Sequence, residues 1–332
     1  MKMHRQQGMA LLVMLLLLTV MSILASQMTQ SYRLVWQKSI NSQVAQQQRW
    51  YLLGGESFIG RVLSQSARDE LGKTTLAQYW AIQGRVFPVE DSRMNGEVSD
   101  AQACFNINSL LTYEDPGEKQ LAAPPFYAEQ VFFHLLRGLE LDEYRAQQVT
   151  AAVEDWLDAN TAPRQNGSED NDYLALTPPY LPANQAMQDI SELRMVKGVD
   201  AALYRRLVPY LCALPETTLQ ININTLGTQQ APLLSALFVN TLSMQEAGRI
   251  IAQRPRDGWD SVAQFLQQDA LLNIAATDAG ASVDSVLSVK SAYFEARLQV
   301  QTANQKTSMK SLFHRQSDNQ MRVIRRHYGE TW

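Results

Sequence analysis

The seventeen residues Met9–Ala25 read MALLVMLLLLTVMSILA and carry no charge. As a helix that rises about 1.5 Å per residue they cover about 25 Å, close to the minimum that crosses the hydrocarbon core of a bilayer. The preceding residues, MKMHRQQG, include Lys2 and Arg5, and no basic residue follows the apolar run immediately. This asymmetry predicts a membrane-spanning helix with its N-terminus in the cytoplasm and the rest of the chain on the opposite side.

The helical pattern continues well beyond the apolar run. Neither glycine nor proline occurs anywhere in residues 9–53. Val35, Trp36, Ile40 and Val44 prolong an apolar stripe at helical spacing among polar residues. An unbroken helix over residues 9–53 would be roughly 68 Å long, apolar all round in its first half and amphipathic in its second.

Two interpretations of this segment compete. In the first, the apolar run is a secretory signal peptide that is cleaved after Ala25. In the second, the cut falls before the run, between Gly8 and Met9, and the helix is retained as a stem. The absence of a helix-breaking residue where the first interpretation needs one favours the retained stem.

Composition restricts the possible functions. The 332 residues include 29 Lys and Arg against 33 Asp and Glu, so the net charge of −4 supplies no global basic field for nucleic-acid binding. Two cysteines are too few for a disulfide scaffold or a Cys-rich zinc site, although one bridge is possible. No nucleophile motif, phosphate loop, zinc triad or dinucleotide fingerprint accompanies the four histidines. We therefore predict that the chain is not an enzyme.

The remainder of the chain predicts strands on either side of a helical middle. The expected strands are 79–87 and 103–108, with a turn at Asn95-Gly96 between them, and then 291–311 and 320–327. The expected helices lie within 124–283 and include 130–139, 142–157, 191–196, 201–214 and 244–253. Strands that flank a helical region predict an α+β domain interrupted by an insertion, with no second domain in tandem.

The leader, the glycine at its end and the long helix resemble the class III signal of type IV pilins and type II secretion pseudopilins. The resemblance implies that a prepilin peptidase cuts after Gly8 and methylates the new N-terminus at Met9. Most members carry a glutamate where this chain has Val13. That glutamate pairs with the N-terminal amine of an adjacent subunit, and an unpaired buried carboxylate is costly. The valine therefore points to a subunit with no neighbour ahead of it, at the fibre tip.

The later sequence resembles the minor pseudopilin K family of the type II secretion system over nearly its full length. The segments that carry the resemblance are Ala103–Leu110 (ACFNINSL), Asp155–Asp158 (DWLD), Gly167–Tyr173 (GSEDNDY), Glu192–Gly198 (ELRMVKG), Ile221–Thr225 (ININT) and Ser291–Phe294 (SAYF). The implied fold is α+β, with a pilin-like long N-terminal helix packed on a small antiparallel sheet and interrupted by a large, mostly α-helical inserted domain. The implied boundaries are a leader at 1–8, a stem helix at 9–53, a discontinuous pilin-like domain at 54–115 and 284–332, and the insertion at 116–283.

The same resemblance implies a function in assembly. A member of this family caps or initiates the periplasmic pseudopilus and so supports protein export across the outer membrane. The implied partners are minor pseudopilins I and J, the major pseudopilin, the prepilin peptidase and the inner-membrane assembly platform. The implied location is the Gram-negative inner membrane, held by one helix, with the bulk of the protein in the periplasm at the pseudopilus tip.

The acidic segment 153–172 contains the candidate metal ligands. Its side chains offer oxygen only, without a nearby His or Cys, which favours calcium over zinc. It is not an EF-hand, because Ala162 and Pro163 stand where that loop needs a ligand and a glycine. Either the segment is a solvated acidic loop or it forms a looser site, and the family resemblance implies a structural Ca²⁺ here. The candidate ligands are Asp155, Asp158, Asn160, Glu169, Asp170 and Asp172.

A periplasmic location also bears on the two cysteines, Cys104 and Cys212. An oxidising compartment favours a disulfide, whereas two unrelated buried thiols are the alternative. The even count and the family resemblance together imply the bridge Cys104–Cys212. Such a bridge would tie the predicted sheet to the insertion.

The alternative function is that of a membrane-anchored helix-hairpin-helix DNA-binding protein. Val196–Asp200 (VKGVD) resembles the hairpin whose backbone N–H groups hold a phosphate through a Gly-hydrophobic-Gly turn. Here Asp200 replaces the second glycine, and its carboxylate would repel a phosphate. Together with the excess of acidic residues, this predicts that the chain does not bind nucleic acid and retains the hairpins for packing.

Overall fold

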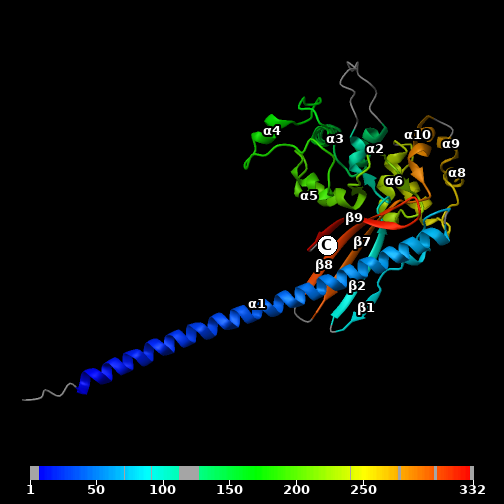
Figure 1. Cartoon of the computed structure of the whole chain (residues 1–332). Helices are drawn as coiled ribbons and strands as arrows, with labels where there is room; N and C mark the ends of the chain where they lie inside the picture. Colours follow the sequence, from blue (N-terminus) through cyan, green and yellow to red (C-terminus); the bar gives the residue numbers. More distant parts are fainter. Residues whose placement is uncertain are drawn as a thin grey trace, which may run out of the picture.

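The computed structural model describes residues 7–70, 72–90, 92–111, 127–239, 241–275, 278–302 and 305–329. Within these residues one helix, α1 (Gln7–Asp69), is long and apolar enough to cross a membrane. Its apolar first half projects away from the body of the molecule (Figure 1), and its side chains there are exposed. The Gly8–Met9 peptide bond lies in the first turn of α1, whereas residues 1–6 of the predicted leader lie outside the described residues.

Helix α1 does not end near Leu53, as the sequence predicts, but continues through Gly54 and Gly55 to Asp69. The two glycines do not break it because tertiary packing stabilises this part of the helix. Leu52 and Leu63, which flank the glycines, are fully buried against the sheet. A Cβ atom at Gly55 would lie 2.8 Å from the sulfur of Met94, so the glycine permits close approach of helix and sheet.

The sheet on which α1 packs is antiparallel throughout and has the strand order β1-β2-β7-β8-β9. Its strands are β1 (Val86–Val89), β2 (Ser92–Asp100), β7 (Tyr293–Gln301), β8 (Lys306–Arg315) and β9 (Met321–Tyr328). The face toward α1 carries the apolar residues Phe294, Ala296, Leu298 and Val300, which alternate along β7 with half-exposed polar residues. The strand prediction for the C-terminal region is confirmed in part: 320–327 matches β9, whereas 291–311 covers two strands, β7 and the first part of β8.

Three predictions for the N-terminal half were wrong in whole or in part. Of the predicted strand 103–108, only Phe105–Asn106 is a strand, and Ile107–Leu110 forms a 3₁₀ turn. Asn95 and Gly96 do not form a turn but lie inside β2, opposite Gln299 and Leu298 of β7. The segment predicted as a strand over 79–87 is a 3₁₀ turn, η1 (Tyr79–Ala81), followed by the short β1. The turn-forming residues Asn95 and Gly96 lie in a regular strand because tertiary packing outweighs their local preference for a turn. A Cβ atom on Gly96 would lie 3.1 Å from Leu298, so the close packing requires glycine there.

The chain between β2 and β7 forms the mostly helical insertion. Its elements are β3 (Phe105–Asn106), η2 (Ile107–Leu110), α2 (Tyr127–Gly138), α3 (Glu143–Leu157), α4 (Asp170–Leu174), η3 (Ile190–Met195), α5 (Ala201–Leu207), η4 (Val208–Tyr210), β4 (Leu211–Cys212), β5 (Ile221–Asn222), η5 (Thr228–Gln230), α6 (Ala231–Leu237), α7 (Met244–Ala252), α8 (Val262–Leu266), α9 (Leu272–Ala275), α10 (Asp278–Val286) and β6 (Leu287–Ser288). These elements enclose the largest hydrophobic core of the molecule. The predicted boundary at 115/116 lies outside the described residues, and the one at 283/284 falls inside α10.

The insertion lies at the end of the sheet that is farthest from the apolar run. Near the sheet's other end, the side chain of Gln48 on α1 donates to the backbone oxygen of Gln305 at 3.4 Å. Farther along α1, Ser64 accepts from the backbone N–H of Met321 at 2.9 Å. The insertion leaves the sheet at Asp100 and returns at its register neighbour Phe294, at the same end of the sheet as this second contact. Figure 1 shows it stacked on the sheet at the end of the stem.

Candidate functional site

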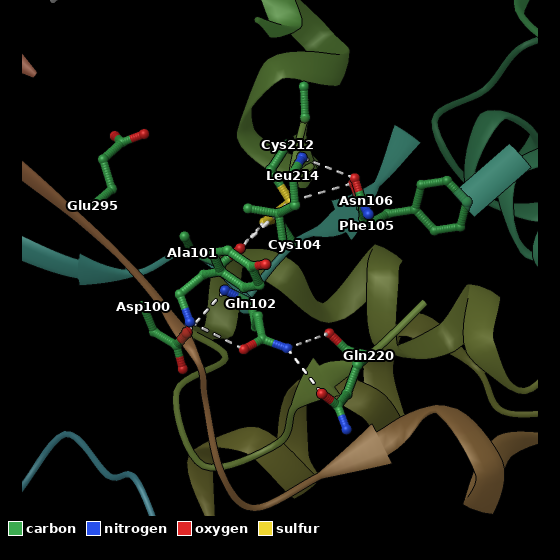
Figure 2. The surroundings of a disulfide bond; sticks show 12 residues. Asp100, Ala101, Gln102, Cys104, Phe105, Asn106, Cys212, Leu214, Gln220 and Glu295 are labelled. Carbon is green, nitrogen blue, oxygen red and sulfur yellow. Dashed lines mark hydrogen bonds between the residues drawn. A yellow bond between two sulfur atoms is a disulfide. The ribbon is translucent and has the colours of Figure 1, made fainter. Parts of the chain in front are cut away.

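A disulfide joins Cys104, four residues after the end of β2, to Cys212 in the middle of the insertion. Their sulfur atoms lie 2.13 Å apart and their Cα atoms 5.9 Å apart. The bond adjoins a short parallel ladder in which Phe105 pairs with Leu211. Figure 2 shows the bond between two segments that come from opposite halves of the insertion. The bond is half-buried, and it links the residues just after β2 to those just after η4.

A buried carboxylate, that of Asp100, lies at the same junction. It accepts hydrogen bonds from the Ser291 hydroxyl at 2.5 Å, the Thr225 hydroxyl at 2.6 Å, the Gln102 backbone N–H at 2.8 Å and the Asn222 amide at 3.0 Å. Burial raises the pKa of Asp100, and the four donors oppose that shift. The donors come from three separate chain segments, just after β2, around β5 and just before β7, so one side chain of the sheet holds these segments together.

Side-chain amides complete this junction. Gln102 donates to the side-chain oxygen of Gln220 at 3.1 Å (Figure 2). It also accepts from the backbone N–H of Ala292 at 2.5 Å. Asn106 accepts from the backbone N–H of Leu214 at 3.0 Å. Amides replace backbone partners that irregular chain segments cannot provide for themselves. The sequence contains no signal for these roles, since each partner is more than a hundred residues away.

The acidic loop lies at the C-terminal end of α3 and is organised around Asp155. The Asp155 carboxylate accepts from the backbone N–H groups of Ser168 at 2.7 Å and Arg164 at 3.2 Å. A Cβ atom on Gly167 would lie 1.9 Å from an Asp155 oxygen, so only glycine fits there. These contacts fold the loop back over the helix end and bring its acidic residues together.

Arg164 supplies the positive charge nearest to these carboxylates. Its guanidinium lies 3.7 Å from both Glu154 and Asp155 and 3.6 Å from Asp158. Burial, together with the neighbouring negative charges, raises the pKa of Glu154 to about 8 and that of Glu169 to about 7. Burial likewise raises the pKa of Asp155 to about 6. A second positive charge would stabilise the ionised forms of this cluster.

The structure brings only some of the predicted ligands together. Asp155, Asp158 and Glu169 are buried side by side in the cluster, where both oxygens of Glu169 are without a hydrogen-bond partner. Asn160 accepts instead from the backbone N–H of Ala162, and Asp172 forms a 2.6 Å ion pair with Lys197. Asp170 is half-exposed beside Glu169. Within the described ranges, no group of three or more His, Cys, Asp or Glu side chains is arranged to hold a metal ion.

The hairpin that resembles a DNA-binding motif has a structural role in this chain. Gly198 occupies the left-handed region at φ +86°, as a tight turn before a helix requires. Asp200 caps α5 by accepting from the N–H groups of Ala202 and Leu203, and it forms a 2.7 Å ion pair with Arg145. The N–H groups that a phosphate would need are therefore occupied by the chain's own carboxylate.

An apolar anchor helix, a pilin-like α+β body and a helical insertion with an internal disulfide define a membrane-anchored pseudopilin with an enlarged head. Comparison with known proteins agrees. Family models described as type II secretion system, protein K match residues 103–216 and 221–287. The chain belongs to the type II secretion system protein K family.

Individual relatives match almost end to end. The type II secretion system protein K of Klebsiella pneumoniae is 43% identical over 329 residues, which cover 99% of this chain and 98% of the relative. That of Aeromonas hydrophila is 42% identical over 330 residues, with 98% of each chain covered. A chain in the crystal structure of the GspK-GspI-GspJ complex from enterotoxigenic Escherichia coli superposes with a TM-score of 0.80 at 35% identity, covering 89% of this chain and all of that one. The pilin-like α+β fold is thereby confirmed.

Proposed function

We propose that this chain is the minor pseudopilin at the tip of a type II secretion pseudopilus, where it caps or initiates the fibre together with minor pseudopilins I and J. The related chain of known structure is part of a GspK-GspI-GspJ complex, which supports these two partners. The proposal extends to protein export across the outer membrane, with the stem in the inner membrane and the body in the periplasm.

The observation that carries this proposal is the position of the insertion. It leaves the sheet at Asp100 and returns at Phe294, at the same membrane-distal end where Ser64 in the last turns of α1 contacts Met321 of β9. Pilin stems stack side by side with small axial steps, so the next subunit would have to place its body where the insertion stands. The replacement of the usual glutamate by Val13 supports the same end position, because a terminal stem has no amine ahead of it to neutralise a buried carboxylate.

Assembly would begin with removal of the leader. We infer that the prepilin peptidase cleaves between Gly8 and Met9 and methylates Met9, and that the assembly platform then adds major pseudopilin subunits below. Lateral contacts would come from α1, whose exposed face carries large apolar residues such as Trp36 and Trp50. Burying such residues against neighbouring stems supplies a non-directional attraction.

Co-purification tests the proposal. The full chain is co-expressed with the prepilin peptidase and with minor pseudopilins I and J, and it is extracted in detergent. We expect one particle that contains all three subunits in equal number, with Met9 as the first residue of this chain by mass spectrometry. Recovery of the chain alone, or a mature N-terminus at Ser26, would refute the proposal.

We also propose that the acidic loop holds a structural Ca²⁺ ion. The buried residues Asp155, Asp158 and Glu169 offer the carboxylate oxygens that a hard cation prefers, and the raised pKa values of Asp155 and Glu169 indicate uncompensated negative charge. Bound calcium would supply positive charge that keeps the carboxylates ionised and the loop closed. Arg164 stands among the same carboxylates, and we expect its side chain to turn outward when the ion binds.

Thermal unfolding of the full chain in detergent tests this site. At a calcium concentration about a hundred times the Kd, linkage predicts a gain of about 2.7 kcal/mol, which a chelator reverses. Glu169→Gln should lose this gain while folding normally without calcium, because it removes a buried negative charge. The matched control, Asp257→Asn, alters an exposed acid elsewhere on the insertion and should retain the gain. An equal gain in both variants would count against the site.

A further inference from the structure

Strand β2 is longer than the strand beside it. Strand β1 pairs with β2 only from Ser92 to Asn95, and β7 pairs with the other side of β2 as far as Asp100. From Gly96 to Ser99, no backbone hydrogen bond between described residues reaches the side of β2 that faces away from β7. This stretch, the open edge, is therefore a row of backbone donors and acceptors available to another extended chain.

A recess lies on each side of the open edge. On the side of α1, an apolar recess of about 60 Å³ is lined by Phe58, Trp80, Ile82 and Val98, among others. On the opposite side, a cleft of about 590 Å³, lined by both polar and apolar residues, extends from Ser99 across the outer face of the sheet to the disulfide. Figure 2 shows Glu295, which lines this cleft, across from the disulfide.

We propose that an extended segment of a neighbouring pseudopilin adds to the open edge as a further strand. Side chains of a strand alternate between its two faces. A chain paired with β2 would therefore direct one set into the apolar recess and the other toward the cleft on the outer face. Strand addition of this kind takes its affinity from backbone hydrogen bonds and its specificity from such recesses.

The position of the recess identifies the occupant. Phe58 lines the apolar recess and is also 45% exposed on the outer face of α1, two helical turns beyond Trp50, which is 72% exposed. A subunit whose stem packs against this face of α1 brings its own body to the open edge. This inference rests on the proposed function, since it takes a stem-packed neighbour as the occupant.

The chemistry of the incoming segment follows from the two faces. Gly96 and Val98 face the α1 side, where apolar side chains fit, because the recess is closed by aromatic and aliphatic residues. Glu97 and Ser99 are exposed on the outer face, where the carboxylate of Glu97 favours a basic neighbour. The segment should alternate apolar residues with polar or basic ones.

The opposite edge of the sheet is poorly suited to strand addition. A register shift between Leu312 and Phe313 of β8 places a bulge in β9, and bulges interrupt pairing with a new strand. Arg325 of β9 donates to backbone oxygens of the insertion, at Gln188 and Ala213, so that strand is also held against the insertion. The open edge of β2 has regular strand geometry and is therefore the better site for an added strand.

Hydrogen exchange followed by mass spectrometry tests the inference on the full chain in detergent, alone and in complex with minor pseudopilins I and J. We expect the peptide covering 96–101 to exchange at least tenfold more slowly in the complex, while the peptide covering β9 is unchanged. A complex that forms with unchanged exchange over 96–101 would refute strand addition and leave the proposed function intact. Failure to form the complex would overturn both. Protection in the isolated chain that grows with its concentration would assign the edge to a second copy and overturn the inference.

A pair of variants separates the edge from general stability. Val98→Asp places a charge beside the apolar recess, and we expect it to weaken binding of the I and J pair about tenfold or more, as loss of an interface anchor does. Ile324→Asp makes the same kind of change at the half-exposed bulge of β9 and should change affinity less than about twofold. Equal losses in two variants with matched melting temperatures would contradict the inference.

Discussion

The ion pair between Glu56 of α1 and Arg326 of β9 links the stem to the sheet, and it predicts which of two substitutions destabilises the protein more. Glu56 of α1 is 3% exposed, and it accepts from the Arg326 guanidinium at 2.6 and 2.7 Å and from the Ser311 hydroxyl at 2.6 Å. Arg326 is 44% exposed. Glu56→Ala therefore leaves a cation that reaches water and one buried hydroxyl without an acceptor, which costs about 1–3 kcal/mol.

Arg326→Ala has the greater expected cost. It leaves the buried carboxylate of Glu56 with the Ser311 hydroxyl as its remaining partner, and breaking a buried ion pair in this way costs about 3–5 kcal/mol. Urea unfolding of the full chain in detergent, followed by tryptophan fluorescence, measures both. Arg322→Ala, on the same strand but exposed, should change the free energy of unfolding by less than about 0.5 kcal/mol. A Glu56→Ala variant as destabilised as Arg326→Ala would refute the reasoning.

Three further predictions concern the insertion. Replacing both Cys104 and Cys212 by serine opens a loop that the disulfide closes over a sequence separation of 108. In urea titrations this should lower the free energy of unfolding by about 2–4 kcal/mol. Adding a reductant to the unmodified chain should cause the same loss. Gly167→Ala forces a Cβ atom onto a buried carboxylate and should lower the melting temperature, whereas Gly138→Ala, with nothing within 4 Å of the added atom, should not. Burial raises the folded-state pKa of Asp100. The contribution of Asp100 to the free energy of unfolding is therefore greatest below about pH 4, and it falls as pH rises through the folded-state pKa. The stability of the unmodified chain relative to Asp100→Asn should therefore decline between pH 4 and pH 8, and a rising difference would contradict this.

The sequence predicts well those elements whose residues alternate or recur regularly. The apolar run marks the start of α1, and the strand-like composition of residues 291–311 and 320–327 predicts strands in the region where β7, β8 and β9 lie. Prediction fails where tertiary packing overrides local preference. Gly55 and Gly96 both read as breaks, yet each lies in a regular element because helix and sheet approach too closely there for a side chain.

The candidate site shows a different limit. The acidic residues are visible in the sequence, and Asp155, Asp158 and Glu169 do come together. The sequence does not show that Arg164 lies among them or that Asp172 turns to Lys197, because both depend on how the loop folds back over α3. The role of Asp100 is invisible for the same reason, since its donors are brought to it by the fold of the whole insertion.

The central claim is that this subunit occupies the membrane-distal end of the fibre, and labelling tests it most directly. A peptide tag replaces the segment 117–121, which precedes α2 of the insertion, and gold-conjugated antibody then locates it on isolated pseudopili by electron microscopy. The tagged chain must first retain its complex with minor pseudopilins I and J. The account predicts label at one end of each fibre and none along its length. Label distributed along the fibres would contradict it.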